Sequence, residues 1–462
     1  MARWAILGRP RGARPPEPRH AWITPEVVIA TDPLGWSLVD GWLPVAAGTL
    51  GLTALAAIGW SRRRRWWLWV VPCTVTGCLV VVAGIVLTVD VWWRPFPEPL
   101  PPPVVGLAGA GILATMLATL RCRSLPWRGR AGVMLAALLV ALTVVTQTNV
   151  YFSAYPTLRA ALGMTVTVVP FEQVADPAAR LVDAPPGEAL DQVWRAPPGL
   201  PEGGTVSKLV IPAAGDFEAR PAWVYLPPAY QATPRPRLPV LVLLAGQPGF
   251  TTDWLRFGQL PPAMDQFASE HGGLAPVVVM PDTLGSPLAN PLCLDSRLGS
   301  VETYLAVDVP TWIRAHLQVS EDPAAWAIGG FSQGGTCALQ LAVRAPAVYS
   351  TFVSIAGQRE PTLGDRELTV ERAFGGDAAA FAEVNPLDVL ADTRFPGTAG
   401  AIVAGRQDHR YHPDAREVLE ACLRAGMDMH WLELPGGHNW AVWRPALPAL
   451  LPWLARRLGL VR

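Results

Sequence analysis

The clearest chemical signal in the sequence is a serine between glycines, in the pattern Gly330-x-Ser332-x-Gly334. An apolar run typical of a buried strand precedes the pattern, and small and aliphatic residues typical of a packed helix follow it. Between a strand and a helix, such a serine occupies a sharp, strained turn that holds its hydroxyl above the sheet. Glycine is needed two positions to either side, because a side chain there would collide with neighbouring backbone. We therefore predict that Ser332 is a catalytic nucleophile.

A serine hydroxyl is a weak nucleophile at neutral pH, so it needs a base, and the base needs an acid that orients it. Asp408 comes just after one predicted strand, and His438 lies in a glycine-rich loop after the next. Because the carboxyl ends of parallel strands meet at one edge of a sheet, we expect both loops to lie near Ser332. The order serine, acid, histidine also fits this chemistry. Asp414 is the alternative acid, although its place near a helix start has a structural explanation too.

Acyl transfer also needs an oxyanion hole, in which fixed N–H groups meet the developing negative charge. One donor is expected to be the backbone N–H of Gln333, the residue after the nucleophile. The second should come from the loop after an earlier strand, where Gln247 precedes Pro248. Proline has no N–H, so Gln247 is the predicted donor and Gly249 the alternative.

Two cysteines lie close to the predicted site. Cys293 belongs to a loop, and Cys337 lies about one helical turn after Ser332. A disulfide between them is permitted outside the cytoplasm and would tether the loop beside the site. Pairing cannot be deduced from sequence alone, so two unpaired buried thiols remain an equal alternative.

No metal or cofactor is predicted. His409, His412 and Asp414 have a spacing that could bind a metal, but no further ligand is evident, so we interpret them as surface residues. The chain carries 37 basic and 37 acidic residues, and its basic residues form only short arginine clusters. This balance argues against a nucleic-acid partner.

The C-terminal half alternates strand-like and helical segments, which predicts a mostly parallel sheet covered by helices on both faces. The predicted strands are 222–226, 239–245, 276–280, 325–329, 351–355, 399–403 and 429–434. Amphipathic stretches at 307–316 and 415–425 are predicted helices. The fold class is therefore α/β.

Several motifs in this half give it a family resemblance. They are Glu-Thr-Tyr-Leu at 302–305, Val-Pro-Thr-Trp-Ile at 309–313, the serine turn, and Pro-Gly-Gly-His-Asn-Trp at 435–440 with Trp443. In this order they resemble the "Putative esterase" family of α/β-hydrolases, which includes the antigen 85 mycolyltransferases and S-formylglutathione hydrolase. The resemblance covers residues 206–462. It implies a sheet of about eight strands, with Ser332 as nucleophile, Asp408 as acid and His438 as base.

The sequence departs from the mycolyltransferases at two points. Those enzymes use glutamate as the acid, whereas Asp408 is closer to the general esterases. They also carry Asp-Gly-Leu-Arg in the oxyanion loop to contact a sugar, whereas this chain has Ala-Gly-Gln-Pro at 245–248. The long connection 358–398 is where we expect a substrate-covering segment that sets specificity.

The N-terminal third has the composition of a membrane region. Only 16% of all residues are charged and 51% are hydrophobic, whereas soluble proteins carry about 25% charged residues. Apolar runs long enough to cross a bilayer occur at 38–60, 66–93, 104–120 and 131–148. Tryptophans cluster at their ends, where an aromatic belt would lie. We predict four transmembrane helices within 37–150, between a disordered tail at 1–36 and a linker at 151–205.

Arginines in the short loops predict the orientation in the membrane. One cluster, 62–65, separates the first two runs, and a second, within 121–130, separates the last two. The positive-inside rule assigns both loops to the cytoplasm. The α/β domain is then expected outside the cytoplasm, in a multi-pass protein of the cell membrane with the lipid bilayer as a partner.

Together these features predict a membrane-anchored serine esterase that acts on an ester or acyl-lipid substrate. An acyltransferase, which passes the acyl group to a sugar or lipid hydroxyl, would use the same residues. A transporter or sensor, with the α/β domain as a binding module, is the third hypothesis. Ionisable residues within the membrane usually mark transport, and only Asp40 and Asp90, near predicted helix ends, suggest it here.

Overall fold

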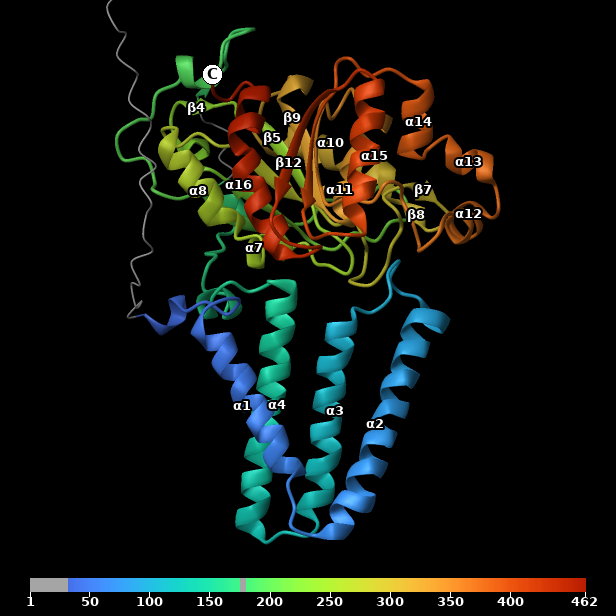
Figure 1. The fold of residues 1–462 in the computed structure, drawn as a ribbon. Coiled ribbons are helices and arrows are strands. Elements are labelled where there is room, and N and C mark those ends of the chain that lie inside the picture. The colour runs from blue at the N-terminus through green and yellow to red at the C-terminus, as the bar shows by residue number, and fades with distance from the viewer. Residues whose placement is uncertain (1–31, 175–179) are drawn as a thin grey trace, which may run out of the picture.

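The computed structural model describes residues 32–174 and 180–462 and has two parts, a bundle of long helices and an α/β domain (Figure 1). Most of the predicted disordered tail lies outside the described residues. Its last residues include a short 3-10 helix, Pro33–Gly35.

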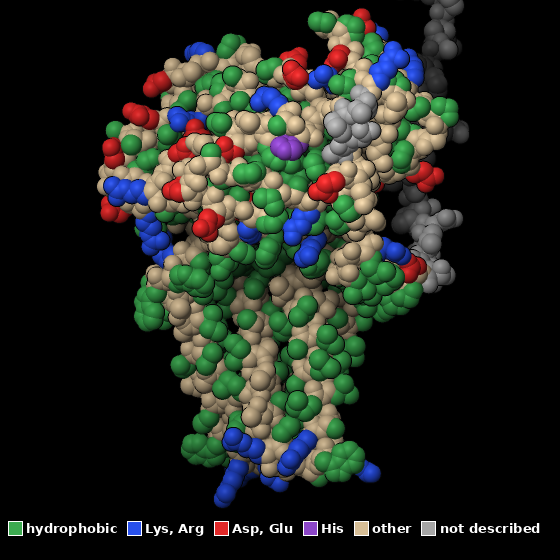
Figure 2. All heavy atoms as spheres, turned by 180° about the vertical axis from the view of Figure 1, so that it is seen from behind, with side chains coloured by type: hydrophobic (Ala, Val, Ile, Leu, Met, Phe, Trp, Pro, Cys, Tyr) green, Lys and Arg blue, Asp and Glu red, His purple; other side chains and the backbone are tan. Residues whose placement is uncertain are grey.

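The bundle consists of four helical spans, each long and apolar enough to cross a membrane. They are α1 (Trp42–Gly59), the continuous span Trp66–Trp93 that contains α2 (Val71–Val86), α3 (Pro102–Cys122) and α4 (Trp127–Phe152). At most 22% of the apolar window of any span is buried, so most of its apolar surface faces outward (Figure 2). Lipid would suit such a surface better than water.

The third and fourth helices are longer than the apolar runs that predicted them. Proline explains where both begin, since α3 starts at Pro102 and α4 follows Pro126 directly. Proline suits a helix start because the N–H that it lacks would have no partner there. The first helix begins later than predicted, after Gly41, which has a φ of 79°.

Helices α1 and α4 approach each other through small side chains. A Cβ on Gly51 would lie 2.2 Å from the Thr143 Oγ1, so only glycine fits there. The same hydroxyl donates to the Ala47 carbonyl, 2.6 Å away. Close backbone approach and hydrogen bonds of this kind hold membrane helices together, because lipid offers no hydrophobic drive for their association.

The α/β domain contains one eight-stranded sheet in the order β12-β11-β10-β9-β5-β6-β3-β2. The neighbours from β12 to β6 pair in parallel, and β3 and β2 add antiparallel edges. The strands are β2 (Thr205–Leu209), β3 (Ala222–Leu226), β5 (Val240–Leu244), β6 (Val277–Met280), β9 (Trp326–Phe331), β10 (Thr351–Ile355), β11 (Ala399–Gly405) and β12 (Asp428–Leu434). The predicted fold class is confirmed. Of the strands in this sheet, only β2 was not predicted.

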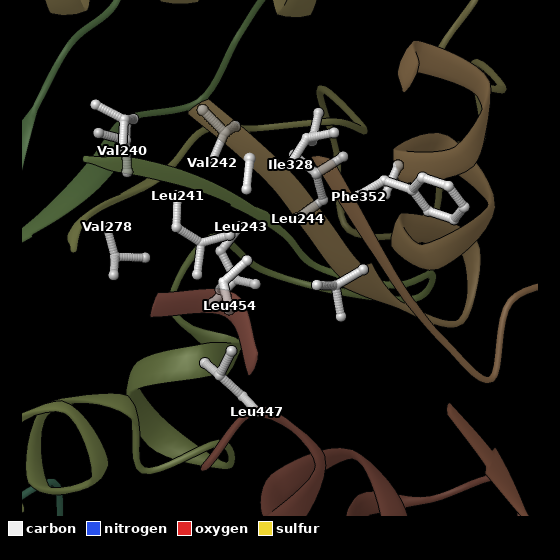
Figure 3. Packing of buried hydrophobic residues seen from close by; sticks show 14 of the residues in the cluster. Val240, Leu241, Val242, Leu243, Leu244, Val278, Ile328, Phe352, Leu447 and Leu454 are labelled. Carbon is white, nitrogen blue, oxygen red and sulfur yellow. The ribbon is translucent and has the colours of Figure 1, made fainter. Parts of the chain in front are cut away.

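Helices cover both faces of this sheet. Helices α8 (Leu260–Glu270) and α16 (Trp440–Arg457) lie on one face, and α11 (Gln333–Arg344), α14 (Pro386–Asp392) and α15 (Tyr411–Arg424) lie on the other (Figure 1). The central strand β5 is buried along its whole length. Figure 3 shows its side chains packed against Leu447 and Leu454 of α16 and against neighbouring strands. Burial on both faces explains its continuous aliphatic sequence.

Part of the predicted linker 151–205 packs against the α/β domain and is not a free stalk. Leu190 and Trp194 are 2% and 3% exposed and belong to the main core. The Trp194 indole donates to the Pro234 carbonyl at 3.1 Å, and the Leu190 N–H donates to the Gly459 carbonyl at 2.9 Å. Two large apolar residues in a proline-rich segment therefore fasten it to the domain, because their burial removes apolar surface from water.

The chain that leaves α4 binds α16 directly. Arg444 donates to the carbonyls of Ser153 and Ala154, both at 2.6 Å, and the Tyr155 ring lies 4.9 Å from that of Phe257. Burial lowers the pKa of Arg444 to about 10. These contacts attach the helical bundle to one side of the α/β domain.

Candidate active site

Ser332 lies in the turn between β9 and α11 with a φ of 52°. Its N–H donates to the Ile355 carbonyl at 2.8 Å, which ties the turn to the neighbouring strand β10. A Cβ on Gly330 would lie 2.5 Å from the Gly334 carbonyl oxygen, and one on Gly334 would lie 2.4 Å from the Ala245 carbonyl oxygen. Both glycines are therefore required by backbone contacts, as the sequence pattern predicts.

Three side chains from separate loops form one hydrogen-bonded chain. The Ser332 Oγ lies 2.9 Å from the His438 Nε2, and the His438 Nδ1 lies 2.9 Å from the Asp408 Oδ2. Asp408 follows β11, and His438 follows β12, at the same edge of the sheet as the serine. Ser332 and Asp408 are 7% and 4% exposed. The arrangement can carry a proton from the serine to the imidazole while the carboxylate holds the ring.

Asp408 is held in its ionised form. Burial by itself would raise the pKa of its carboxyl group, but the hydrogen bond and the charge of His438 act against burial and prevail, together with backbone N–H donors. One of these donors is the Tyr411 N–H, 3.0 Å from the Asp408 Oδ1. The pKa of Asp408 therefore lies below its usual value, so the group can stabilise an imidazolium.

Two aromatic rings enclose His438. The Tyr411 ring lies 4.5 Å from the imidazole, and the Trp443 ring lies 5.0 Å away and nearly perpendicular to it. Trp443 in turn stacks on Phe331, at the end of the strand that leads to the serine. The family motif includes Trp443, but Tyr411 was not predicted as part of the site. Its position just after Asp408, at the start of a helix, was the only available signal.

The alternative acid and the suggested metal cluster have other partners. The Asp414 Oδ2 accepts the Arg359 N–H at 3.3 Å, and burial raises the pKa of Asp414. His412 lies 3.0 Å from Glu433 on the neighbouring strand. Within residues 32–174 and 180–462, His, Cys, Asp and Glu form no group of three that could hold a metal ion.

The two predicted oxyanion donors belong to the serine turn and to the loop after β5, which packs against that turn. Gln333 is the first residue of α11, where helix geometry leaves backbone N–H groups without a partner inside the helix. Gln247 lies in the loop after β5, and its side-chain amide donates to the carbonyls of Pro95 and Leu288, both at 2.9 Å. The use of either backbone N–H as an oxyanion donor stays a prediction.

Buried charges support the loop that contains Gln247. Arg220 donates to the Gly249 carbonyl at 3.0 Å and pairs with the fully buried Asp282 at 2.5 Å. Asp253 accepts the Phe250 N–H at 3.0 Å, and burial raises its pKa to about 7. Removing one partner of such a buried ion pair typically destabilises a fold by about 3–5 kcal/mol. These groups fix the loop next to the nucleophile.

The structure joins Cys293 and Cys337 in a disulfide. Leu292 and Cys293 both have positive φ values, 66° and 53°, which non-glycine residues adopt at some strain. The Cys293 carbonyl accepts from the Gln340 side chain at 2.6 Å. The bridge therefore tethers a strained loop to the helix that follows the nucleophile.

The long connection between β10 and β11 carries three helices: α12 (Arg366–Phe374), α13 (Ala378–Ala382) and α14. Its first residues lie near the site, since the Gln358 N–H donates at 2.9 Å to the Thr336 hydroxyl, on the helix that follows Ser332. Asp365 forms an ion pair with Arg94 from the helical bundle at 3.4 Å. A role in substrate specificity stays a prediction.

The sheet order and the serine turn define an α/β-hydrolase. A model of the family described as "Esterase: Putative esterase" matches residues 218–454. An uncharacterized protein of Corynebacterium glutamicum is 34% identical over 420 residues, which cover 88% of this chain and 94% of that protein. The chain belongs to the "Putative esterase" family and is a carboxylic ester hydrolase of the serine type.

Solved structures match a little more than half of the chain. They include a ferulic acid esterase, with 19% identity, a TM-score of 0.48, and coverage of 56% of this chain and 99% of that one. An S-formylglutathione hydrolase from Agrobacterium tumefaciens has 21% identity, a TM-score of 0.46, and coverage of 56% and 97%. Mycobacterium tuberculosis MPT51 has 19% identity, a TM-score of 0.39, and coverage of 55% and 98%.

Proposed function

We propose that the protein is a membrane-anchored serine esterase that cleaves carboxylic esters outside the cytoplasm through an acyl-enzyme. The observation that carries this proposal is the hydrogen-bonded chain from Ser332 through His438 to Asp408. Membership of an esterase family supports the same chemistry.

In the proposed mechanism the Ser332 Oγ attacks the ester carbonyl while the His438 Nε2 takes the hydroxyl proton. Asp408 stabilises the imidazolium that forms, and the N–H groups of Gln333 and Gln247 are the proposed donors to the oxyanion. When the oxyanion collapses, the imidazolium gives its proton to the departing alcohol. Water, activated by His438, then attacks the acyl-enzyme and releases the acid.

Anchoring in a membrane is supported by the four apolar helical spans. The relative from Corynebacterium glutamicum supports it as well. The α/β domain makes up little more than half of the chain, so an alignment over 88% of the chain extends into the helical bundle. This relative therefore shares sequence with at least part of the helical bundle.

Two features support a site outside the cytoplasm. The arginine-rich connections, between α1 and α2 and between α3 and α4, lie at the end of the bundle away from the α/β domain (Figure 2), and such loops are typically cytoplasmic. The bond between Cys293 and Cys337 is of a kind that persists in oxidising compartments.

The rival hypotheses receive unequal support. The Asp90 carboxylate accepts the Leu100 N–H at 3.0 Å, which gives it a structural role at a helix end. Asp40 precedes α1. Neither position favours transport.

An acyltransferase would use every residue named above, so product analysis with and without polyol acceptors is the measurement that separates transfer from hydrolysis.

Replacement of Ser332 tests the proposal. We expect Ser332→Ala to abolish hydrolysis of short p-nitrophenyl esters by the purified full-length protein. Unchanged turnover would falsify the assignment.

The side of the membrane on which the active site lies is tested separately, by labelling intact cells with a membrane-impermeant fluorophosphonate. The proposal expects labelling of the wild type without cell lysis and none of Ser332→Ala.

A further inference from the structure

The connection between the second and third helical spans reaches the candidate active site. It comprises residues 94–101 and touches the α/β domain where α2 and α3 approach it (Figure 1). The Glu98 carboxylate accepts the hydrogen bond of the Tyr411 hydroxyl. The Pro97 carbonyl accepts from Arg410 at 3.4 Å, and the Pro95 carbonyl accepts from Gln247 at 2.9 Å.

This connection is stiff. Four of its residues are proline: Pro95, Pro97, Pro99 and Pro101. Proline fixes the backbone φ, so proline-rich segments act as semi-rigid spacers. The Asp90 carboxylate also holds the Leu100 N–H, which joins the end of the connection to the helix before it. Glu98 is therefore presented by a restrained backbone and loses little freedom when it binds Tyr411.

Tyr411 links this connection to the reacting groups. Its hydroxyl binds Glu98, its ring lies 4.5 Å from the His438 ring, and its N–H lies 3.0 Å from the Asp408 Oδ1. The ring is buried, with 4% of the residue exposed. A shift of this ring would change the orientation of the imidazole and of its carboxylate partner.

The same connection also touches the other side of the site. The Gln247 side chain bridges the Pro95 carbonyl and the Leu288 carbonyl, and Gln247 lies in the loop proposed to supply an oxyanion donor. Residues 94–101 therefore contact both the acid–base side and the oxyanion side of Ser332. An anchor alone would not require contacts at these positions.

We propose that the connection 94–101 completes the active site, with Glu98 and Tyr411 as positioning residues that hold His438 and Asp408 in their productive orientation. This inference rests on the proposed esterase function. It makes the helical bundle part of the catalytic apparatus, because the position of two helix ends determines the alignment of the base. Alignment of this kind matters because a misplacement of about 1 Å can lower turnover about a hundredfold.

The test uses full-length protein in detergent and measures kcat, KM and the thermal unfolding midpoint with a short p-nitrophenyl ester. The variants are Glu98→Ala, Glu98→Gln, Tyr411→Phe and the double variant Glu98→Ala with Tyr411→Phe. Glutamine keeps an acceptor for the tyrosine hydroxyl, and phenylalanine keeps the ring. Glu420→Ala is the matched control, since it removes an exposed ion pair with Arg424 from α15, the helix that carries Tyr411, and exposed pairs contribute little.

We expect Glu98→Ala and Tyr411→Phe each to lower kcat about tenfold, with KM and the unfolding midpoint near the wild-type values. Glu98→Gln should retain most of the activity. The double variant should lose no more than Tyr411→Phe alone, because Tyr411→Phe already removes the hydrogen bond that Glu98→Ala removes. The inference is overturned if either single variant matches Glu420→Ala, or if the two losses multiply.

The same assay separates this inference from the proposed function. Wild-type turnover that persists in Ser332→Ala would reject the esterase mechanism itself. Turnover that depends on Ser332 but is unaffected by Glu98→Ala and Tyr411→Phe would reject only the positioning role.

Discussion

Tyr411 contacts both the base and the acid of the candidate active site. Its ring packs against His438, and its N–H donates to Asp408. Because Tyr411 begins α15 three residues after Asp408, one helix start fixes the acid and packs against the base. The rest of the imidazole is enclosed by Trp443 from α16. The base is therefore oriented by two helices on opposite faces of the sheet.

The proposed role of the acid predicts a large effect for Asp408→Asn. An amide cannot stabilise the imidazolium and favours the wrong histidine tautomer, a change that costs about 10⁴ in kcat in a serine protease. We expect a loss of about 10³–10⁴ in kcat with little change in KM. Asp414→Asn is the matched control, because Asp414 bonds Arg359. A loss in the control as large as that in Asp408→Asn would contradict the assignment.

The serine turn predicts a specific intolerance at Gly334. The added methyl of Gly334→Ala would lie 2.4 Å from the Ala245 carbonyl oxygen, so the turn must shift. We expect at least a hundredfold loss of esterase activity, since a shift of about 1 Å is enough. Gly397→Ala is the control, because an added Cβ there meets nothing within 4 Å. Full activity in Gly334→Ala would show that the turn can relax.

The local sequence pattern predicts most strands of the sheet and the three residues of the candidate active site. The strands β3 and β10 begin and end where the sequence indicates, because both are short, mostly apolar segments that the fold buries. The order Ser332, Asp408, His438 follows from the fold, so their proximity in space was expected. The edge strand β2 was missed, because its sequence mixes polar and apolar residues after a proline-rich segment.

Contacts between distant segments could not be predicted in this way. Glu98 and Tyr411 are separated by 313 positions, and Gln247 and Pro95 by 152. Neither the hydrophobic periodicity of the sequence nor a motif indicates which connection between helices will contact which loop. The pairing of Cys293 with Cys337 is the same kind of information, since it depends on the approach of a loop to a helix and not on spacing.

We expect the double variant Cys293→Ala with Cys337→Ala, which removes the disulfide, to be less stable than the wild type. The bridge closes a loop of 44 residues, and loss of that closure costs about 4 kcal/mol in the chain-entropy estimate. We expect a lower thermal unfolding midpoint. The control is Cys73→Ala, which changes an exposed free cysteine. Equal midpoints for the double variant and the control would show that the bridge adds no stability.

Asp253 predicts a pH dependence of stability. Burial raises its pKa from 3.8 to about 7, so the folded protein binds this proton more tightly than the unfolded chain. The stability linked to the proton is fully present below about pH 4 and is lost as pH rises through 7, a change of roughly 4 kcal/mol. Asp253→Asn cannot ionise, and its carbonyl can still accept the Phe250 N–H. Between pH 4 and 8 the unfolding midpoint of the variant should therefore fall less than that of the wild type. Parallel pH profiles would mean that folding does not raise the pKa of Asp253.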